Sequence, residues 1–138
     1  MTLIHGTSIA LDGRGVLLRG PSGSGKSDLA LRLLESGARL VADDQTELTR
    51  EGEGVIMSAP APIAGRIEAW GLGIVEVPAL GAAKLALVVD LVPRERLERL
   101  PEPQSCQILG AIFPLLALCP FDASASAKLK LAVKVLIP

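Results

Sequence analysis

The sequence predicts a single α/β domain over residues 1–138, in which a mixed sheet with flanking helices carries a phosphate-binding loop. Residues 20–27 fit the pattern G-x-x-x-x-G-K-[ST] without a mismatch. An apolar run precedes this loop and a helical pattern follows it, which is the context that the pattern requires. Hydrophobic residues make up 49% of the chain but aromatic residues only 2%, a composition typical of parallel strands buried under helices.

Charge, hydrophobic stretches and cysteine content indicate the kind of partner and compartment to expect. The formal net charge is −1, so no nucleic-acid or membrane surface is expected. The apolar stretches are shorter than the roughly 20 residues of a membrane span, and the N-terminus lacks the pattern of a signal peptide. Cys106 and Cys119 lack metal-ligand spacing and are expected to be free thiols. These features predict a small cytoplasmic protein.

The elements around the loop follow from local patterns. Asp12-Gly13 between the apolar runs 8–11 and 16–18 predicts a β-hairpin that leads into the loop. A helix is expected after the loop from about Lys26, and Ser36-Gly37 predicts its end.

The next strand is predicted at residues 39–42 and ends in Asp43-Asp44. One helix connects it to the strand before the loop, so the two strands are expected to be parallel, with a right-handed connection. The two carboxylates then lie at the edge of the sheet where ligands bind in open α/β folds.

The patterns are weaker in the rest of the chain. Residues 45–65 predict a turn near Gly52 and a short strand at 55–57, and the prolines at 59–62 predict an extended, non-helical connector. The segment 65–78 predicts a strand with a β-bulge at its glycines.

Three further elements are predicted before the C-terminus. Residues 85–89 form the most apolar run and predict a central strand, and residues 93–100 predict one or two helical turns. The apolar run 108–118 is expected to break at Pro114. Residues 122–136 fit a capped helix, although alternating lysines also fit a strand.

The loop has the residue types that phosphate binding needs. Its glycines permit backbone angles closed to other residues, so successive N–H groups can surround an anion. The N-terminus of the following helix points at the same anion. Lys26 is expected at the outer phosphates and Ser27 at Mg²⁺. A merely flexible turn is the alternative for such a run. The predicted nucleotide-binding residues are Gly20, Pro21, Ser22, Gly23, Ser24, Gly25, Lys26 and Ser27.

With these motifs, the sequence resembles the C-terminal catalytic domain of the HPr kinase/phosphorylase family. Four segments carry the resemblance: Ile4-His5-Gly6, the loop from Gly20 to Asp28, the strand end 40–44, and Ile67 to Val77, which is similar to the family's glycine signature. Their order and spacing agree over roughly residues 3–90. The resemblance implies the fold that HPr kinase shares with PEP carboxykinase-like proteins.

The resemblance also implies an activity. It is that of an ATP-dependent serine kinase that acts on HPr, the phosphocarrier protein of the sugar phosphotransferase system, and thereby regulates carbohydrate metabolism. The reverse reaction would use inorganic phosphate and release pyrophosphate.

By the same resemblance, each motif has a role. Lys26 would bind phosphates, and Ser27 and Glu68 would hold Mg²⁺. Asp43 would take the proton from the substrate serine in the kinase direction and return it in the reverse one. His5 would assist, and Arg99-Leu100 is similar to a catalytic Arg-Leu pair. Hexamers are the assembly that the family implies, and apolar segments near residues 112–118 are expected at an interface.

The sequence departs from the family's pattern in three places. It corresponds to the short form without the family's N-terminal domain. Trp70 stands where the glycine signature normally has Arg, and no Pro-Gly-Arg-Asn segment occurs near residues 113–127. Two other functions remain open at this point: a P-loop kinase of a small molecule, and a regulator that binds ATP without transferring phosphate.

Overall fold

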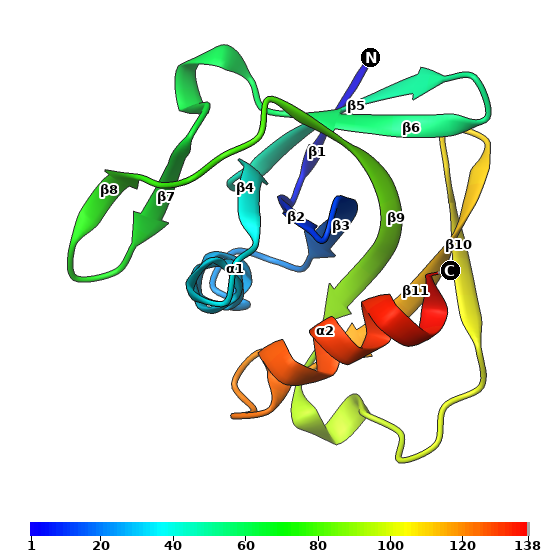
Figure 1. The fold of residues 1–138 in the computed structure, drawn as a ribbon. Coiled ribbons are helices and arrows are strands. Elements are labelled where there is room, and N and C mark those ends of the chain that lie inside the picture. The colour runs from blue at the N-terminus through cyan, green and yellow to red at the C-terminus, as the bar shows by residue number, and fades with distance from the viewer. Residues whose placement is uncertain (138) are drawn as a thin grey trace.

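The computed structural model describes residues 1–137 and has a curled, mixed sheet with two helices, as the sequence predicts (Figure 1). The main path of the sheet has the strand order β1-β5-β6-β9-β3-β2-β4, and β11 joins it beside β9, with β10 outside β11. A separate two-stranded sheet consists of β7 and β8.

The strands are β1 Thr2–His5, β2 Thr7–Leu11, β3 Arg14–Arg19, β4 Arg39–Ala42, β5 Gln45–Glu51, β6 Gly54–Ser58, β7 Arg66–Ala69, β8 Gly73–Glu76, β9 Ala82–Leu91, β10 Gln104–Ile108 and β11 Ala111–Leu118. The helices are α1 Lys26–Glu35 and α2 Ala125–Leu136, with short 3₁₀ turns η1 Ala61–Ile63 and η2 Arg94–Arg96.

The hairpin before the loop is confirmed as β2 and β3, which pair antiparallel. Its turn residues Asp12 and Gly13 both have positive φ, 51° and 77°. This is the two-residue turn whose twist matches that of the strands it joins. The hairpin delivers the end of β3 directly into the loop at Gly20.

The helix α1 ends where Ser36-Gly37 predicts. The N–H of Ala38 donates to the carbonyl of Leu33 and that of Gly37 to the carbonyl of Leu34, both at 3.1 Å, and Gly37 has φ 103°. This is a Schellman ending. The chain then enters β4, which runs parallel to β3, with β2 lying between them and antiparallel to both.

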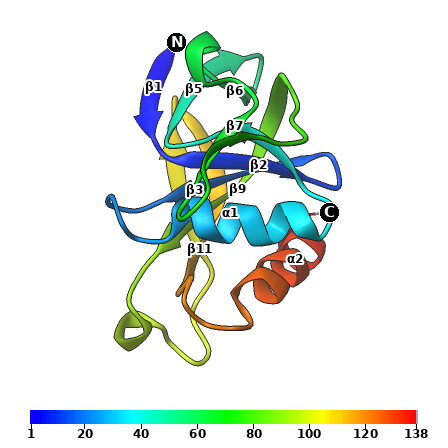
Figure 2. The same cartoon turned by 90° about the vertical axis from the view of Figure 1, so that its left-hand side faces the viewer.

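The sheet is buried on both faces, which explains its continuous apolar runs. Val16 and Leu18 of β3 pack in the cluster that includes α1 and α2, whereas Leu17 packs in the opposite cluster. Both helices therefore cover one face, where they lie side by side (Figure 2). The other cluster includes residues of β5, β6, β10 and β11. The flanking helices thus occupy one face only, because hairpins cover the second.

The strand β9 is central, as predicted. It pairs in parallel with β3 and β11 and antiparallel with β6. Its ten residues are longer than the predicted run 85–89, because β6 pairs with the polar N-terminal part of the strand.

One strand was not predicted, and two predictions about weak patterns are wrong. Residues 45–51 form β5, a strand whose alternating burial is hidden by its polar composition. A 3₁₀ turn, η1 at Ala61–Ile63, overlaps the proline segment 59–62, because Pro62 occupies its first turn, where no N–H is needed. The strand β11 continues through Pro114, since its parallel pairing with β9 begins only at Leu115 and leaves the proline without a ladder partner on that side.

The glycine segment 65–78 is a hairpin instead of one bulged strand. β7 and β8 pair antiparallel, and the chain turns at residues 70–72. The C-terminal segment is the helix α2, and of the one or two helical turns predicted over residues 93–100 the structure has one, η2. Both cysteines are free. Among the described residues, no helix is long and apolar enough to cross a membrane.

The ending of α1 yields a prediction about stability. Gly37→Ala should destabilise the protein by about 1–2 kcal/mol, because the left-handed conformation brings a Cβ close to the following carbonyl. The added methyl group causes no steric clash, since no atom lies within 4 Å of a Cβ built at this position. Gly81→Ala is the control: the same open space surrounds it, without the positive φ, and its effect on the free energy of unfolding in urea should stay within about 0.5 kcal/mol. Equal stabilities of the two variants would contradict this account.

Candidate functional site

The loop between β3 and α1 has a backbone that depends on its glycines. Gly23 and Gly25 have φ of 80° and 97°, and Gly25 is the N-cap residue of α1. At Gly20 the constraint is space, because an added Cβ would lie 2.5 Å from Ser24 Oγ. The glycines thus fix the path of the loop into the first turn of α1, whose N–H groups lack partners within the helix and are available to an anion.

Lys26 lies in the middle of this loop and is only 6% exposed. Its Nζ donates hydrogen bonds to the carbonyls of Gly20 at 2.7 Å and Pro21 at 3.0 Å. Burial lowers the pKa of Lys26, and the nearby Asp44 and Asp43 carboxylates oppose that shift. An ammonium group has three N–H donors, and two point at the loop. The third can serve a phosphate oxygen.

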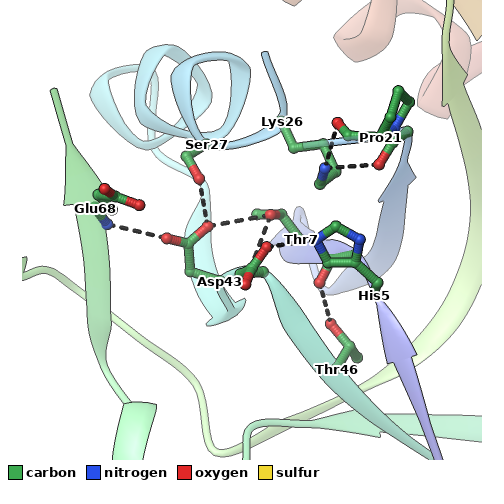
Figure 3. A network of polar contacts seen from close by, with 11 residues as sticks. His5, Thr7, Pro21, Lys26, Ser27, Asp43, Thr46 and Glu68 are labelled. Carbon is green, nitrogen blue, oxygen red and sulfur yellow. Dashed lines mark hydrogen bonds and ion pairs between the residues drawn. The ribbon is translucent and has the colours of Figure 1, made fainter. Parts of the chain in front are cut away.

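Asp43 is the buried carboxylate of the site. Its Oδ1 accepts hydrogen bonds from Ser27 Oγ at 2.6 Å and Thr7 Oγ1 at 3.1 Å, and its Oδ2 accepts one from the backbone N–H of Glu68 at 2.9 Å. Figure 3 shows Asp43 with Ser27 and Glu68 on one side and Thr7 on the other. The predicted base, the loop serine and the glycine-signature residue are therefore brought together.

Thr7 is the residue that sequence reasoning missed. It is fully buried, donates to Asp43, and accepts the backbone N–H of Asp44 at 3.1 Å. One hydroxyl thus fixes both members of the acidic pair. The sequence does contain a signal for such a role, the polar pair Thr7-Ser8. It stands at the start of a strand that is buried at every position, where polar groups need hydrogen-bond partners.

His5 and Asp44 form a second, more exposed pair. His5 Nε2 lies 2.7 Å from Asp44 Oδ1. The backbone of Asp44 has φ 65°, and its carbonyl accepts the N–H of Gly6 at 2.8 Å. This left-handed turn directs Asp44 toward β1 while Asp43 faces α1, so adjacent carboxylates have different partners.

Glu68 borders a cavity of about 190 Å³ beside the two carboxylates. Its side chain is exposed, although its backbone N–H is fixed on Asp43. The cavity is bounded by η1 and the β7–β8 hairpin as well as by Asp43 and Asp44. It gives a route from solvent to the Asp43 carboxylate.

The oxygen ligands of the site fit Mg²⁺. Ser27 offers a hydroxyl and Glu68 an exposed carboxylate, the kinds of oxygen ligand that Mg²⁺ takes together with substrate phosphates. Among residues 1–137, no group of three or more His, Cys, Asp or Glu side chains is arranged to hold a metal on its own.

Two residues of interest lie outside this hydrogen-bonded cluster. Arg99 follows η2 in an exposed segment and, within the described chain, forms no hydrogen bond or ion pair. Trp70 lies at the turn between β7 and β8 with 91% of its surface exposed.

A glycine loop that opens a helix, with a buried carboxylate on its serine, defines a P-loop nucleotide-binding α/β domain. The chain belongs to the HPr Serine kinase C-terminal domain family, whose model matches residues 1–111. The family resemblance noted from the motifs is thereby confirmed.

Relatives with known names support this assignment. The HPr kinase/phosphorylase of Geobacillus sp. (strain WCH70) is 42% identical over 110 residues, which cover 72% of this chain and 35% of the relative. That of Geobacillus kaustophilus (strain HTA426) is 39% identical over 129 residues, 85% of this chain and 42% of the relative. The chain thus spans roughly a third to two fifths of the curated relatives it matches.

A solved structure matches the whole fold. The Hpr(Ser) kinase/phosphatase from Coxiella burnetii superposes with a TM-score of 0.88 at 26% identity, covering 99% of this chain and 96% of that chain. The predicted fold class is confirmed.

The role of Thr7 can be tested by stability. Thr7→Val keeps the shape of the side chain but leaves the Asp43 carboxylate and the Asp44 N–H each without one partner. We expect a loss of about 1–3 kcal/mol in the free energy of unfolding. Thr49→Val, at an exposed position of β5, is the matched control and should change stability by less than about 0.5 kcal/mol. A Thr7→Val variant as stable as the control would show that these bonds contribute little.

Proposed function

We propose that this domain transfers the γ-phosphoryl group of ATP to a serine hydroxyl of the phosphocarrier protein HPr. The names of its relatives support the reaction and the substrate. The observation that carries the proposal is the contact of Asp43 with Ser27, because it joins a general base to the phosphate-binding loop. Asp43 also lines the smaller cavity, through which an acceptor hydroxyl could reach it.

The phosphates are bound by the loop. The N–H groups of the loop and the dipole of α1 favour the anionic phosphates, and Lys26 supplies a cation at their centre. Phosphoryl transfer requires neutralisation and alignment of charge more than covalent chemistry by the protein. Ser27 and Glu68 would hold Mg²⁺, with Asp43 orienting the Ser27 hydroxyl. Mg²⁺, when bound, would neutralise charge on the phosphate oxygens.

Asp43 accepts the proton of the attacking hydroxyl. A carboxylate has about four lone-pair positions, two on each oxygen. Both on Oδ1 are used by Ser27 and Thr7, and one on Oδ2 is used by Glu68 N–H. The remaining position on Oδ2 is the one that we assign to the serine of HPr, which would enter through the cavity beside Asp43.

The same atoms serve the reverse reaction. Inorganic phosphate bound in the loop would attack the phosphorus of phosphoserine, forming pyrophosphate and breaking the bond to the serine oxygen. Asp43 would return its proton to that oxygen. His5 would support this chemistry by holding Asp44 beside the reacting group, and Arg99 would act only if the segment after η2 approaches the bound substrate.

Incubation with Mg²⁺, labelled ATP and HPr tests the proposal. Phosphoserine on HPr is the expected product, and pyrophosphate should appear when phosphoserine-HPr and inorganic phosphate are supplied instead. ATP binding without transfer would identify an ATP-sensing regulator. Transfer to a small molecule but not to HPr would identify a different P-loop kinase.

Asp43→Asn should abolish most transfer while leaving ATP affinity largely unchanged. General-base losses are typically about a hundredfold or more in rate. The Asn side chain has only one acceptor oxygen, so it cannot accept both the Glu68 N–H and the Ser27 and Thr7 hydroxyls, and thermal stability is measured in parallel. Glu53→Gln, in an exposed turn, is the control that should keep full activity. A folded Asp43→Asn variant with normal turnover would refute the base assignment.

Lys26→Met should weaken ATP binding by about tenfold or more, because a hydrogen bond to a charged group contributes about 1.5–3 kcal/mol. Isothermal titration calorimetry provides the dissociation constants. Lys134→Met, on the exposed face of α2, removes the same charge elsewhere and should leave affinity unchanged. Unaltered binding by the Lys26 variant would mean that the phosphates bind away from the loop.

A further inference from the structure

A second and larger cavity, of about 540 Å³, adjoins the loop on the side away from Asp43. It is lined by loop residues 21–24, by the end of β9 with η2, and by residues 119–121 before α2. Its volume lies within the roughly 300–1,000 Å³ of small-molecule sites. None of its lining residues belongs to the set that lines the smaller cavity.

The two cavities lie on opposite sides of the phosphate position. In Figure 3, Pro21, which lines the larger cavity, and Glu68, which lines the smaller one, flank Lys26 and Ser27 from opposite directions. If the phosphates of a nucleotide occupy the loop, its nucleoside must extend to one side of the loop. The acceptor of the phosphoryl group must then approach from the opposite side. Since Asp43 marks the acceptor side, the larger cavity is left for the nucleoside.

Phe121 gives this cavity an aromatic wall. Its side chain is 72% exposed, yet its ring meets the loop, because a Cβ built on Gly25 would lie 3.5 Å from Phe121 Cε1. The same Cβ would lie 2.9 Å from Pro120 Cγ. An aromatic face held against a phosphate-binding loop and open to solvent is a platform on which a planar base can stack.

Polar contacts hold the walls in place. Arg94 of η2 forms an ion pair with Asp122, and Arg32 of α1 donates to the carbonyl of Pro120. The N–H of Val92 donates to the carbonyl of Leu118 at 2.9 Å. The segments before and after the cavity are thus tied to each other and to α1. Arg96 also lines the cavity and adds a cation that would favour an anionic ligand.

We propose that this cavity is the nucleoside subsite, in which the base of the nucleotide stacks on Phe121 while its phosphates occupy the loop. The inference rests on the proposed function, because it takes the loop as the site of the nucleotide's phosphates. It adds the residues that would separate a nucleoside triphosphate from a bare polyphosphate, and none of these lies in the acceptor half of the site.

Phe121→Ala tests the subsite by comparing two ligands, Mg²⁺-ATP and Mg²⁺-tripolyphosphate, in calorimetry with the full chain. Loss of a stacking platform should weaken ATP binding by about tenfold or more and leave tripolyphosphate binding unchanged. Phe121→Tyr should restore ATP binding, since it keeps the ring. Ile112→Ala removes a side chain of equal exposure, 71%, on β11 and should change neither affinity.

The outcomes separate the two proposals. If the wild-type chain binds both ligands and Phe121→Ala binds ATP normally, the subsite is refuted and the phosphate site stands. An equal loss for both ligands would mean that Phe121 only supports the loop, which also refutes the subsite. A wild-type chain that binds neither ligand would overturn the proposed function together with this inference.

Discussion

The carboxylate of Asp43 accepts hydrogen bonds from three elements that are far apart in the sequence: the hydroxyl of Thr7 on β2, that of Ser27 on α1, and the backbone N–H of Glu68 on β7. A buried carboxylate without such partners would be strongly destabilising. The hairpin, the loop helix and the glycine signature therefore have to meet at the end of β4. Their meeting sets the distance between loop and base, and it leaves a single lone-pair position on Oδ2 for a substrate.

The sheet sets where this meeting takes place. β3 and β4 run parallel with β2 between them, so the loop and the acidic pair lie at the same edge. Burial on both faces, by the helices on one side and by hairpins on the other, leaves this edge as the place where polar groups can gather. Two cavities open there, one on each side of the loop, and they divide the proposed reaction into a nucleotide half and an acceptor half.

The parts of the structure that depend on local chemistry could be predicted from the sequence. Glycine spacing identified the loop, Asp12-Gly13 the hairpin turn, and Ser36-Gly37 the end of α1. Parts that depend on long-range pairing could not be predicted. The polar strand β5 forms because β1 and β6 pair with it on either side, and Pro114 is tolerated because the pairing of β11 with β9 begins only at Leu115. Likewise, the polar pair Thr7-Ser8 indicates a buried polar position but not its partners, since Asp43 and Asp44 follow a strand more than thirty residues later.

Trp70 is the only tryptophan of the chain, which has no tyrosine, and it is 91% exposed at the tip of the β7–β8 hairpin. Its indole is a solvated fluorophore at one defined point, on the same hairpin as Glu68. A protein that binds over this hairpin would move the indole out of water and shift its emission to the blue. The intrinsic fluorescence of the domain therefore reports on contacts made at the hairpin that carries Glu68.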